Sequence, residues 1–267
     1  MKDKFISFLY AVDCYLLYLL SGVVASAAVV AFFSAKAASE YGSLGAPMDS
    51  NDFVDYISAF VTGKSSVVLL VSFAIIILVA LIGFALCRKN IAAYTGMKYA
   101  KPMSIIGALV AGVALNFISY GIMPQTAQNE ETFGIVLVLC VALAPFVEEL
   151  VFRGILLKMF SKSCGIVFAA IITSVLFAIS HGEPLQIIYT FVLGLILSLV
   201  RICSTSLWNA VALHLAFNIT GAFAMLSNPV FSSKGYVLLA IAAAMSVIVA
   251  CSDGRKKRKE KKENEAQ

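Results

Sequence analysis

The stretch APFVEELVFRGILL, from Ala144 to Leu157, places two adjacent glutamates and an arginine inside a long apolar run. Each ionised group costs roughly 2.5 to 3.5 kcal/mol at the centre of a membrane-inserted helix, so three of them are not expected for packing alone. In an α-helix Glu149 and Arg153 are i,i+4 neighbours that can pair, whereas Glu148 is turned about 100° away. One carboxylate is therefore expected to be structural, and the other is available for chemistry.

The composition of the 267 residues indicates the class of protein. Hydrophobic residues make up 61% of the chain and charged residues only 13%, and the mean hydropathy is +0.93. Soluble globular proteins are about half apolar, so this chain is too hydrophobic for that class. The sequence predicts a polytopic membrane protein with an all-α fold, a helical bundle of about eight transmembrane helices.

The charge distribution indicates which partners the chain has, and the cysteines indicate whether disulfides or a zinc site are expected. The net charge of +5 comes largely from the basic run 255–262, which favours a cytoplasmic end beside anionic lipid over a nucleic-acid partner. The six cysteines are scattered and contain no C-x-x-C pair. They are expected to be small hydrophobic side chains, neither disulfides nor a zinc site.

Eight apolar runs of about the length needed to cross a bilayer follow one another along the chain. They occupy residues 5–33, 65–87, 102–123, 133–158, 165–181, 185–200, 207–226 and 235–251. Small residues at 24–28 could mark a signal-peptidase site, but the first run is too long for a signal peptide and continues past them. We therefore expect the first run to be a membrane span.

The connections between these runs predict the orientation. Residues 36–64 and 124–132 are polar and acidic, which favours external loops, whereas residues 88–101 are basic, which favours a cytoplasmic one. Eight crossings would place both termini on the same side of the membrane. We expect the protein to lie in the cell membrane with both termini in the cytoplasm. Counting along the spans leaves His181 nearer the external end than Glu148, so a boundary is misplaced or a helix is tilted or broken.

Two further short motifs lie on predicted spans, Phe177-x-x-x-His181 and His214-x-x-x-Asn218. His214 and Asn218 project from one helix face about one turn apart. A glutamate and a histidine can hold and deprotonate water, and an imidazole N–H beside a carboxamide N–H₂ can stabilise an oxyanion. Together these groups are suited to hydrolysing an amide bond.

Each residue also has a purely structural interpretation. A buried histidine is often only a hydrogen-bonded structural group, and a buried Glu–Arg pair can simply clamp helices. Phe152, Phe177 and Trp208 are expected to face the core or the lipid. The functional interpretation depends on the combination, because both histidines of the chain and the only adjacent pair of acids within a span fall in consecutive spans of the same half.

Other hydrolase patterns are missing from the sequence, which contains neither G-x-S-x-G nor H-E-x-x-H. Glu148, His181 and His214 would nevertheless make a two-histidine, one-carboxylate set of the kind found in catalytic zinc sites. A metal site at these residues is therefore kept as the alternative.

The three elements together resemble the CAAX protease and bacteriocin-processing family of intramembrane endopeptidases, which includes the type II CAAX prenyl endopeptidases. The family pattern is two glutamates with an arginine four residues after the second, then Phe-x-x-x-His, then His-x-x-x-Asn or Asp. All three elements are present, in order, within about residues 133–226.

The resemblance implies a role for each residue. Glu148 would be the general base that activates water, with His181 helping to hold that water. His214 and Asn218 would stabilise the oxyanion, and Glu149 with Arg153 would be the supporting ion pair. Members of the family have been classed as metalloproteases and also described as metal-free, so we expect that no cofactor is required, with zinc as the alternative.

The domain organisation expected on this basis has four parts. N-terminal transmembrane helices and loops occupy 1–132, the catalytic helical core 133–226, the last transmembrane helix 227–251 and a basic cytoplasmic tail 252–267. The expected partners are a peptide or protein substrate, with or without an attached lipid, and the bilayer, with no nucleic acid.

Two other functions are left open by the residues. A non-enzymatic scaffold or bacteriocin self-immunity protein could use the same polar cluster to hold a partner. An ion or solute transporter could use it as a proton path, although the repeated pair of broken helices typical of transporters is not found in the sequence.

Overall fold

The computed structural model describes residues 2–43, 50–86, 90–122, 135–182, 184–227 and 231–252. Every regular element in these ranges is helical, which confirms the all-α prediction. The elements are α1 (Lys2–Ser43), α2 (Ser50–Thr62), α3 (Ser65–Leu86), α4 (Ile91–Thr95), α5 (Pro102–Ile122), α6 (Ile135–Glu149), the π-helical segment η2 (Leu150–Leu156), α7 (Leu157–Cys164), α8 (Ile166–Ile179), α9 (Pro184–Ser204), α10 (Leu207–Ser227) and α11 (Ser233–Ala250).

The predicted spans coincide with helices. The eight apolar runs correspond, in order, to α1, α3, α5, α6 with η2, α8, α9, α10 and α11. Among the described residues, five helices are long and apolar enough to cross a membrane, namely α1, α5, α9, α10 and α11, and shorter apolar segments lie in α3 and α8. The prediction of a polytopic helical bundle is confirmed.

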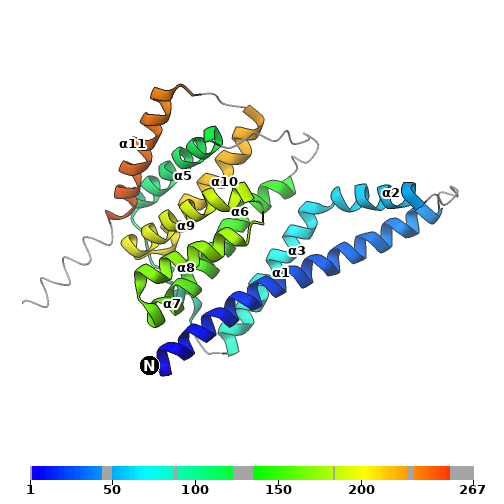
Figure 1. Cartoon of the computed structure of the whole chain (residues 1–267), viewed down its shortest axis with the longest axis horizontal. Helices are drawn as coiled ribbons and strands as arrows, with labels where there is room; N and C mark the ends of the chain where they lie inside the picture. The colour runs from blue at the N-terminus through cyan, green and yellow to red at the C-terminus, as the bar shows by residue number, and fades with distance from the viewer. Residues whose placement is uncertain are drawn as a thin grey trace, which may run out of the picture.

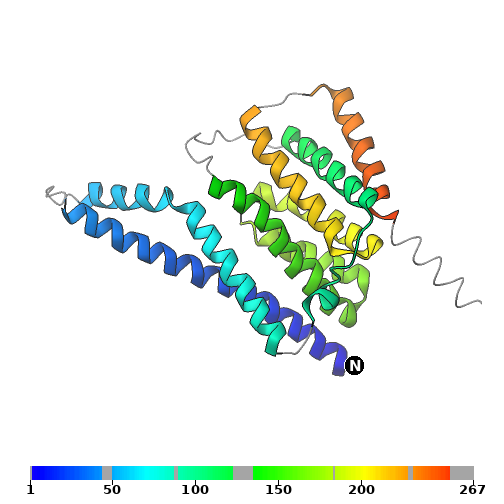
Figure 2. The ribbon, with the colours of Figure 1, turned by 180° about the vertical axis from the view of Figure 1, so that it is seen from behind.

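Helix α10 lies at the centre of the bundle, in contact with α5, α6 and α9 (Figures 1 and 2). In its apolar span 61% of the residues are buried, compared with 6% in the apolar stretch of α1. Its approach to α5 is so close that a Cβ atom at Gly112 would overlap the carbonyl oxygen of Leu213. Small residues permit this kind of close contact between membrane helices, and it holds α10 in place.

The first half of α1 and the end of α3 pack on the bundle, whereas the second half of α1, with α2, forms an arm that extends away from it (Figure 1). With 42 residues, α1 is about 63 Å long at 1.5 Å per residue, or about twice the thickness of the hydrocarbon layer. The prediction of a loop over 36–64 is wrong, because α1 continues to Ser43 and α2 packs back against it. The rings of Phe53 and Tyr56 each lie 5.3 Å from that of Tyr41. Aromatic side chains at helical spacing thus support two helices in a stretch that is otherwise polar.

The basic connection predicted over 88–101 contains the short helix α4. Lys158 donates a hydrogen bond to the carbonyl of Tyr94, at 2.9 Å, and Arg201 donates one to the carbonyl of Thr95, at 3.0 Å. These two bonds attach α4 to α7 and α9 and so tie the first part of the chain to the second. The predicted acidic turn at 124–132 and the basic run at 255–262 lie outside the described residues.

The depths of Glu148 and His181 follow from the hairpin formed by α6, η2, α7 and α8. The first three are consecutive helical segments that end at Cys164, and the chain turns at Gly165, whose φ of +85° is in the left-handed region that favours glycine. Glu148 precedes this turn by 17 residues and His181 follows it by 16. The two residues therefore lie at similar depth. The sequence count misplaced them because it ended the span near Lys158, one to two turns too early.

Candidate active site

The glutamate motif lies where an α-helix changes to a π-helix. Pro145, inside α6, has no N–H to donate to the preceding turn. In η2 the hydrogen bonds become wider, and the N–H of Leu157 donates to the carbonyl of Phe152, five residues earlier. Such segments occur frequently at functional sites. The sequence predicted an ordinary α-helix here, so the π-helical turn is a feature that it missed.

Glu149 and Arg153 form the expected ion pair. Arg153 Nη1 donates to Glu149 Oε1 at 2.7 Å, and both side chains are fully buried. The second guanidinium nitrogen donates to the carbonyl of Gly194 on α9, at 3.1 Å, and the guanidinium carbon lies 4.4 Å from the centre of the Phe177 ring. A buried pair needs such additional contacts to offset the loss of hydration of both charges.

His214 lies between the two glutamates. Its Nδ1 is 3.0 Å from Glu149 Oε1 and its Nε2 is 3.7 Å from Glu148 Oε2. Next to an ionised carboxylate Nδ1 carries the proton, so an Nε2–H is present only when the ring is doubly protonated. The Glu148 side chain is 15% exposed, whereas that of His214 is 2% exposed. Of these two groups, Glu148 is the one that can be reached from outside.

His181 reaches the same region from the end of α8. Its Nδ1 lies 2.8 Å from the carbonyl of Phe177. Because a carbonyl only accepts, Nδ1 is the donor, and Nε2 of the neutral ring is an acceptor. Phe177 is fully buried, and its ring centre lies 4.7 Å from that of His181 and 5.6 Å from that of His214. Arg153 of the first motif lies 4.4 Å from the centre of the same ring, so all three motifs meet around Phe177.

Asn218 follows His214 by one turn of α10 and is partly exposed. Within the described part of the chain, no hydrogen bond joins its carboxamide to another residue. It can therefore present an N–H to a ligand. Trp208, on the same helix, is 40% exposed and stacks on Phe146, in agreement with the expectation that it is not part of the site.

The alternative metal site would need Glu148, His181 and His214 to converge on one ion. Among the described residues, no group of three or more His, Cys, Asp or Glu side chains is placed to hold a metal ion. The Nδ1 atoms of both histidines bond to protein oxygens, so Nε2 is the ring nitrogen that each could offer to a ligand. No step proposed below passes through a metal.

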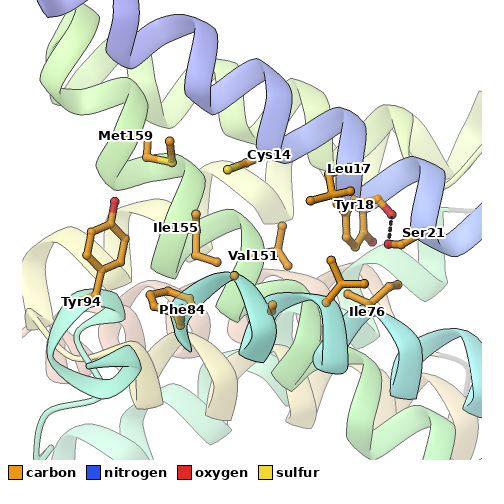
Figure 3. A pocket seen from close by; sticks show the side chains of 13 residues that line it. Cys14, Leu17, Tyr18, Ser21, Ile76, Phe84, Tyr94, Val151, Ile155 and Met159 are labelled. Carbon is orange, nitrogen blue, oxygen red and sulfur yellow. Dashed lines mark hydrogen bonds between the residues drawn. The ribbon is translucent and has the colours of Figure 1, made fainter. Parts of the chain in front are cut away.

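Two contributors to the site were missed in the sequence, because both lie on α1, far from the motifs. Tyr15 donates a hydrogen bond to the carbonyl of Leu176, at 3.2 Å, and the ring of Tyr18 lies 5.4 Å from that of Phe152. Tyr18 also lines a cavity of about 230 Å³ between α1, α3, η2 and α7 (Figure 3). Two tyrosines three residues apart in an apolar span were the available signal, because a buried tyrosine hydroxyl usually needs a partner.

Comparison with known proteins agrees with the motifs. Residues 130–220 match the family model of the type II CAAX prenyl endopeptidases described as Rce1-like. The resemblance to the CAAX protease and bacteriocin-processing family is confirmed. The matched CAAX-protease-like segment contains all three motifs, and with the five apolar helices it identifies an integral membrane protein.

One curated relative is an uncharacterized 24.3 kDa protein of Escherichia coli, 34% identical over 117 residues. The match covers 41% of this chain and 54% of that protein, so the chain spans about half the length of this relative. No solved structure matches the chain.

Proposed function

We propose that this protein is a CAAX-protease-like intramembrane endopeptidase that hydrolyses a peptide bond near the membrane surface. The supporting observation is that residues from three separate helices meet around the Phe177 ring, beside a glutamate side chain that is partly exposed. Glu148 lies 3.7 Å from His214, which is held by Glu149 at 3.0 Å. The family match over residues 130–220 supports the same chemistry.

In the proposed mechanism, Glu148 accepts a proton from a water that His181 Nε2 helps to hold. The water oxygen attacks the scissile carbonyl carbon, and the carbonyl π electrons move to its oxygen. The Nε2–H of protonated His214 and the carboxamide N–H of Asn218 stabilise this oxyanion. When the intermediate collapses, the C–N bond breaks and the proton on Glu148 passes to the leaving amine.

Glu149 and Arg153 act in this scheme through His214. Glu149 accepts the Nδ1 proton and thereby fixes the plane of the imidazole ring, while Arg153 balances the buried carboxylate charge. In this role they orient the oxyanion donor and do not touch the substrate.

The substrate is proposed to be a peptide or protein in or beside the bilayer, with or without a lipid attached, and no nucleic acid takes part. Both termini are placed in the cytoplasm. This orientation is supported by the basic residues Lys158, Lys162 and Arg201, which lie in α7 and at the end of α9. No cofactor is required in the scheme, and zinc dependence is the alternative that chelation tests.

The first experiment compares detergent-purified wild type, Glu148→Ala and Glu148→Gln on quenched fluorescent peptides, prenylated and unprenylated, with and without a chelator. Loss of the general base should lower the cleavage rate by at least about 10²-fold in both variants. Asp52→Asn, which changes an exposed carboxylate on α2, is the matched control and should cleave normally.

The outcomes separate the candidate functions. Cleavage at the wild-type rate by Glu148→Ala would remove the assignment of Glu148. Activity that is lost with the chelator and restored by zinc would favour the metal alternative. If the wild type cleaves nothing in the panel, the scaffold or immunity role, which should tolerate Glu148→Gln, becomes the better interpretation.

A further inference from the structure

Helix α1 brings two tyrosines to the site from outside the CAAX-protease-like segment. The Tyr15 hydroxyl donates to the carbonyl of Leu176 and lies 3.3 Å from Ser180 Oγ. Both partners lie within five residues of His181, so this contact fixes the rotation of α1 against the end of α8. Tyr18 follows Tyr15 by three residues and therefore lies on nearly the same face of α1.

Tyr18 is in contact with the glutamate motif. Its ring meets that of Phe152 edge to face, with 5.4 Å between the centres, and stacks on Tyr15 at 6.4 Å. Phe152 is itself fully buried. Because Phe152 follows Glu148 by one helical turn, the Tyr18 ring lies beside the segment that carries Glu148.

The Tyr18 side chain also borders the apolar cavity. Figure 3 shows it on α1, with Val151 of η2 lining the same space. The Tyr18 hydroxyl makes no hydrogen bond to another residue in the part of the chain that the structure describes. A phenol in apolar surroundings is stabilised by an acceptor, and the Glu148 carboxylate offers one.

We propose that Tyr18 is a positioning residue of the site, whose phenol O–H holds the Glu148 carboxylate through one bridging water. A hydrogen bond donated to a carboxylate is stronger than one between neutral groups. This hydrogen bond would fix one carboxylate oxygen of Glu148 and leave the other oxygen facing the water held by His181. The catalytic part of this inference depends on the proposed function, whereas the proposed link between Tyr18 and Glu148 does not.

The kinetic test is Tyr18→Phe, which keeps the ring and its packing on Phe152 but removes the hydroxyl. The expected result is a fall in kcat of roughly tenfold, the size expected for one hydrogen bond to a charged group, with KM changed less than about twofold. Tyr10→Phe removes a hydroxyl from an exposed position of the same helix and should have no effect. Equal kcat values for the two variants would overturn the proposal.

A second measurement does not need a substrate. Thermal unfolding in detergent is followed for wild type, Tyr18→Phe, Glu148→Gln and the double variant. If the two groups are coupled, the loss of Tm caused by Tyr18→Phe should be smaller by about 2 °C or more in the Glu148→Gln background. Additive Tm changes would overturn the proposal whatever the kinetics. If the Tm changes are coupled but the wild type cleaves nothing, the link between Tyr18 and Glu148 is retained and only the protease function is rejected.

Discussion

At the residue scale, the site depends on one oxygen atom. Glu149 Oε1 lies 2.7 Å from Arg153 Nη1 and 3.0 Å from His214 Nδ1, and all three side chains are almost fully buried. Removing one partner of a buried ion pair leaves the other charge without compensation, which costs more than removing both. The stability of the fold and the orientation of His214 therefore depend on the same group.

Arg153→Ala should lower the free energy of unfolding by about 3 to 5 kcal/mol, because Glu149 would keep a buried charge without its partner. The double variant Glu149→Gln with Arg153→Met should be more stable than Arg153→Ala, because neither charge remains. Chemical or thermal unfolding in detergent measures both. A double variant less stable than Arg153→Ala would show that the ion pair is not what these residues contribute.

The same residues show how much of the site could be predicted. The pairing of Glu149 with Arg153 follows from helical spacing alone, which is a local property of the sequence. The contact between Glu149 and His214 joins residues 65 positions apart, and local spacing carries no information about such a distance. The motif resemblance brought these residues together, but Tyr15 and Tyr18 lie outside every motif and were found only from the packing of α1.

At the element scale, α10 is held by its fit against α5. Glycine at 112 allows the two backbones to approach, and this places the face of α10 that carries His214 toward α6 and η2. Shifting α10 outward would separate His214 from both glutamates. The close contact is thus a requirement of the site as well as of the bundle.

Gly112→Ala should destabilise the protein by about 1 to 3 kcal/mol, because the added Cβ would overlap the backbone of Leu213. Gly83→Ala is the matched control, since a Cβ there meets nothing within 4 Å. It should leave stability unchanged or raise it by up to about 1 kcal/mol through better helix propensity. Equal Tm values for the two variants would contradict this account of α5 and α10.

The helices were predictable where a membrane constrains them. An apolar run of about 20 residues is a strong signal, and all eight such runs correspond to helices. Residues 36–64 give no such signal because their polar side chains face outward, and only the aromatic contacts between α1 and α2 reveal the helices. The π-helical turn of η2 also has no length or hydropathy signature, so sequence reasoning passed over it.

At the scale of the whole molecule, α1 and α2 extend beyond the bundle, as Figure 2 shows. Because α1 is about twice as long as the hydrocarbon layer is thick, its end and α2 should lie in water. Asp52 and Asp55, exposed on α2, suit such a position. With the termini in the cytoplasm, this water would be outside the cell.

Asp52→Cys should react with a membrane-impermeant maleimide in intact cells. Leu20→Cys, which replaces an exposed apolar residue in the first half of α1, should stay unlabelled because lipid surrounds it. The wild-type chain measures the background from its own six cysteines. Labelling of Asp52→Cys only after the cells are opened would reverse the proposed orientation.

The turn at Gly165 also sets a limit on how the chain can change in length. Glu148 and His181 lie at similar depth because nearly equal numbers of residues separate each from that turn. One residue inserted on either side would shift one partner by about 1.5 Å along the helix and rotate it by about 100° away from the other. An insertion between α1 and α2 alters neither count. The length of the hairpin from Glu148 to His181 is therefore constrained by the site, whereas the length of the link between α1 and α2 does not affect how these two residues are placed.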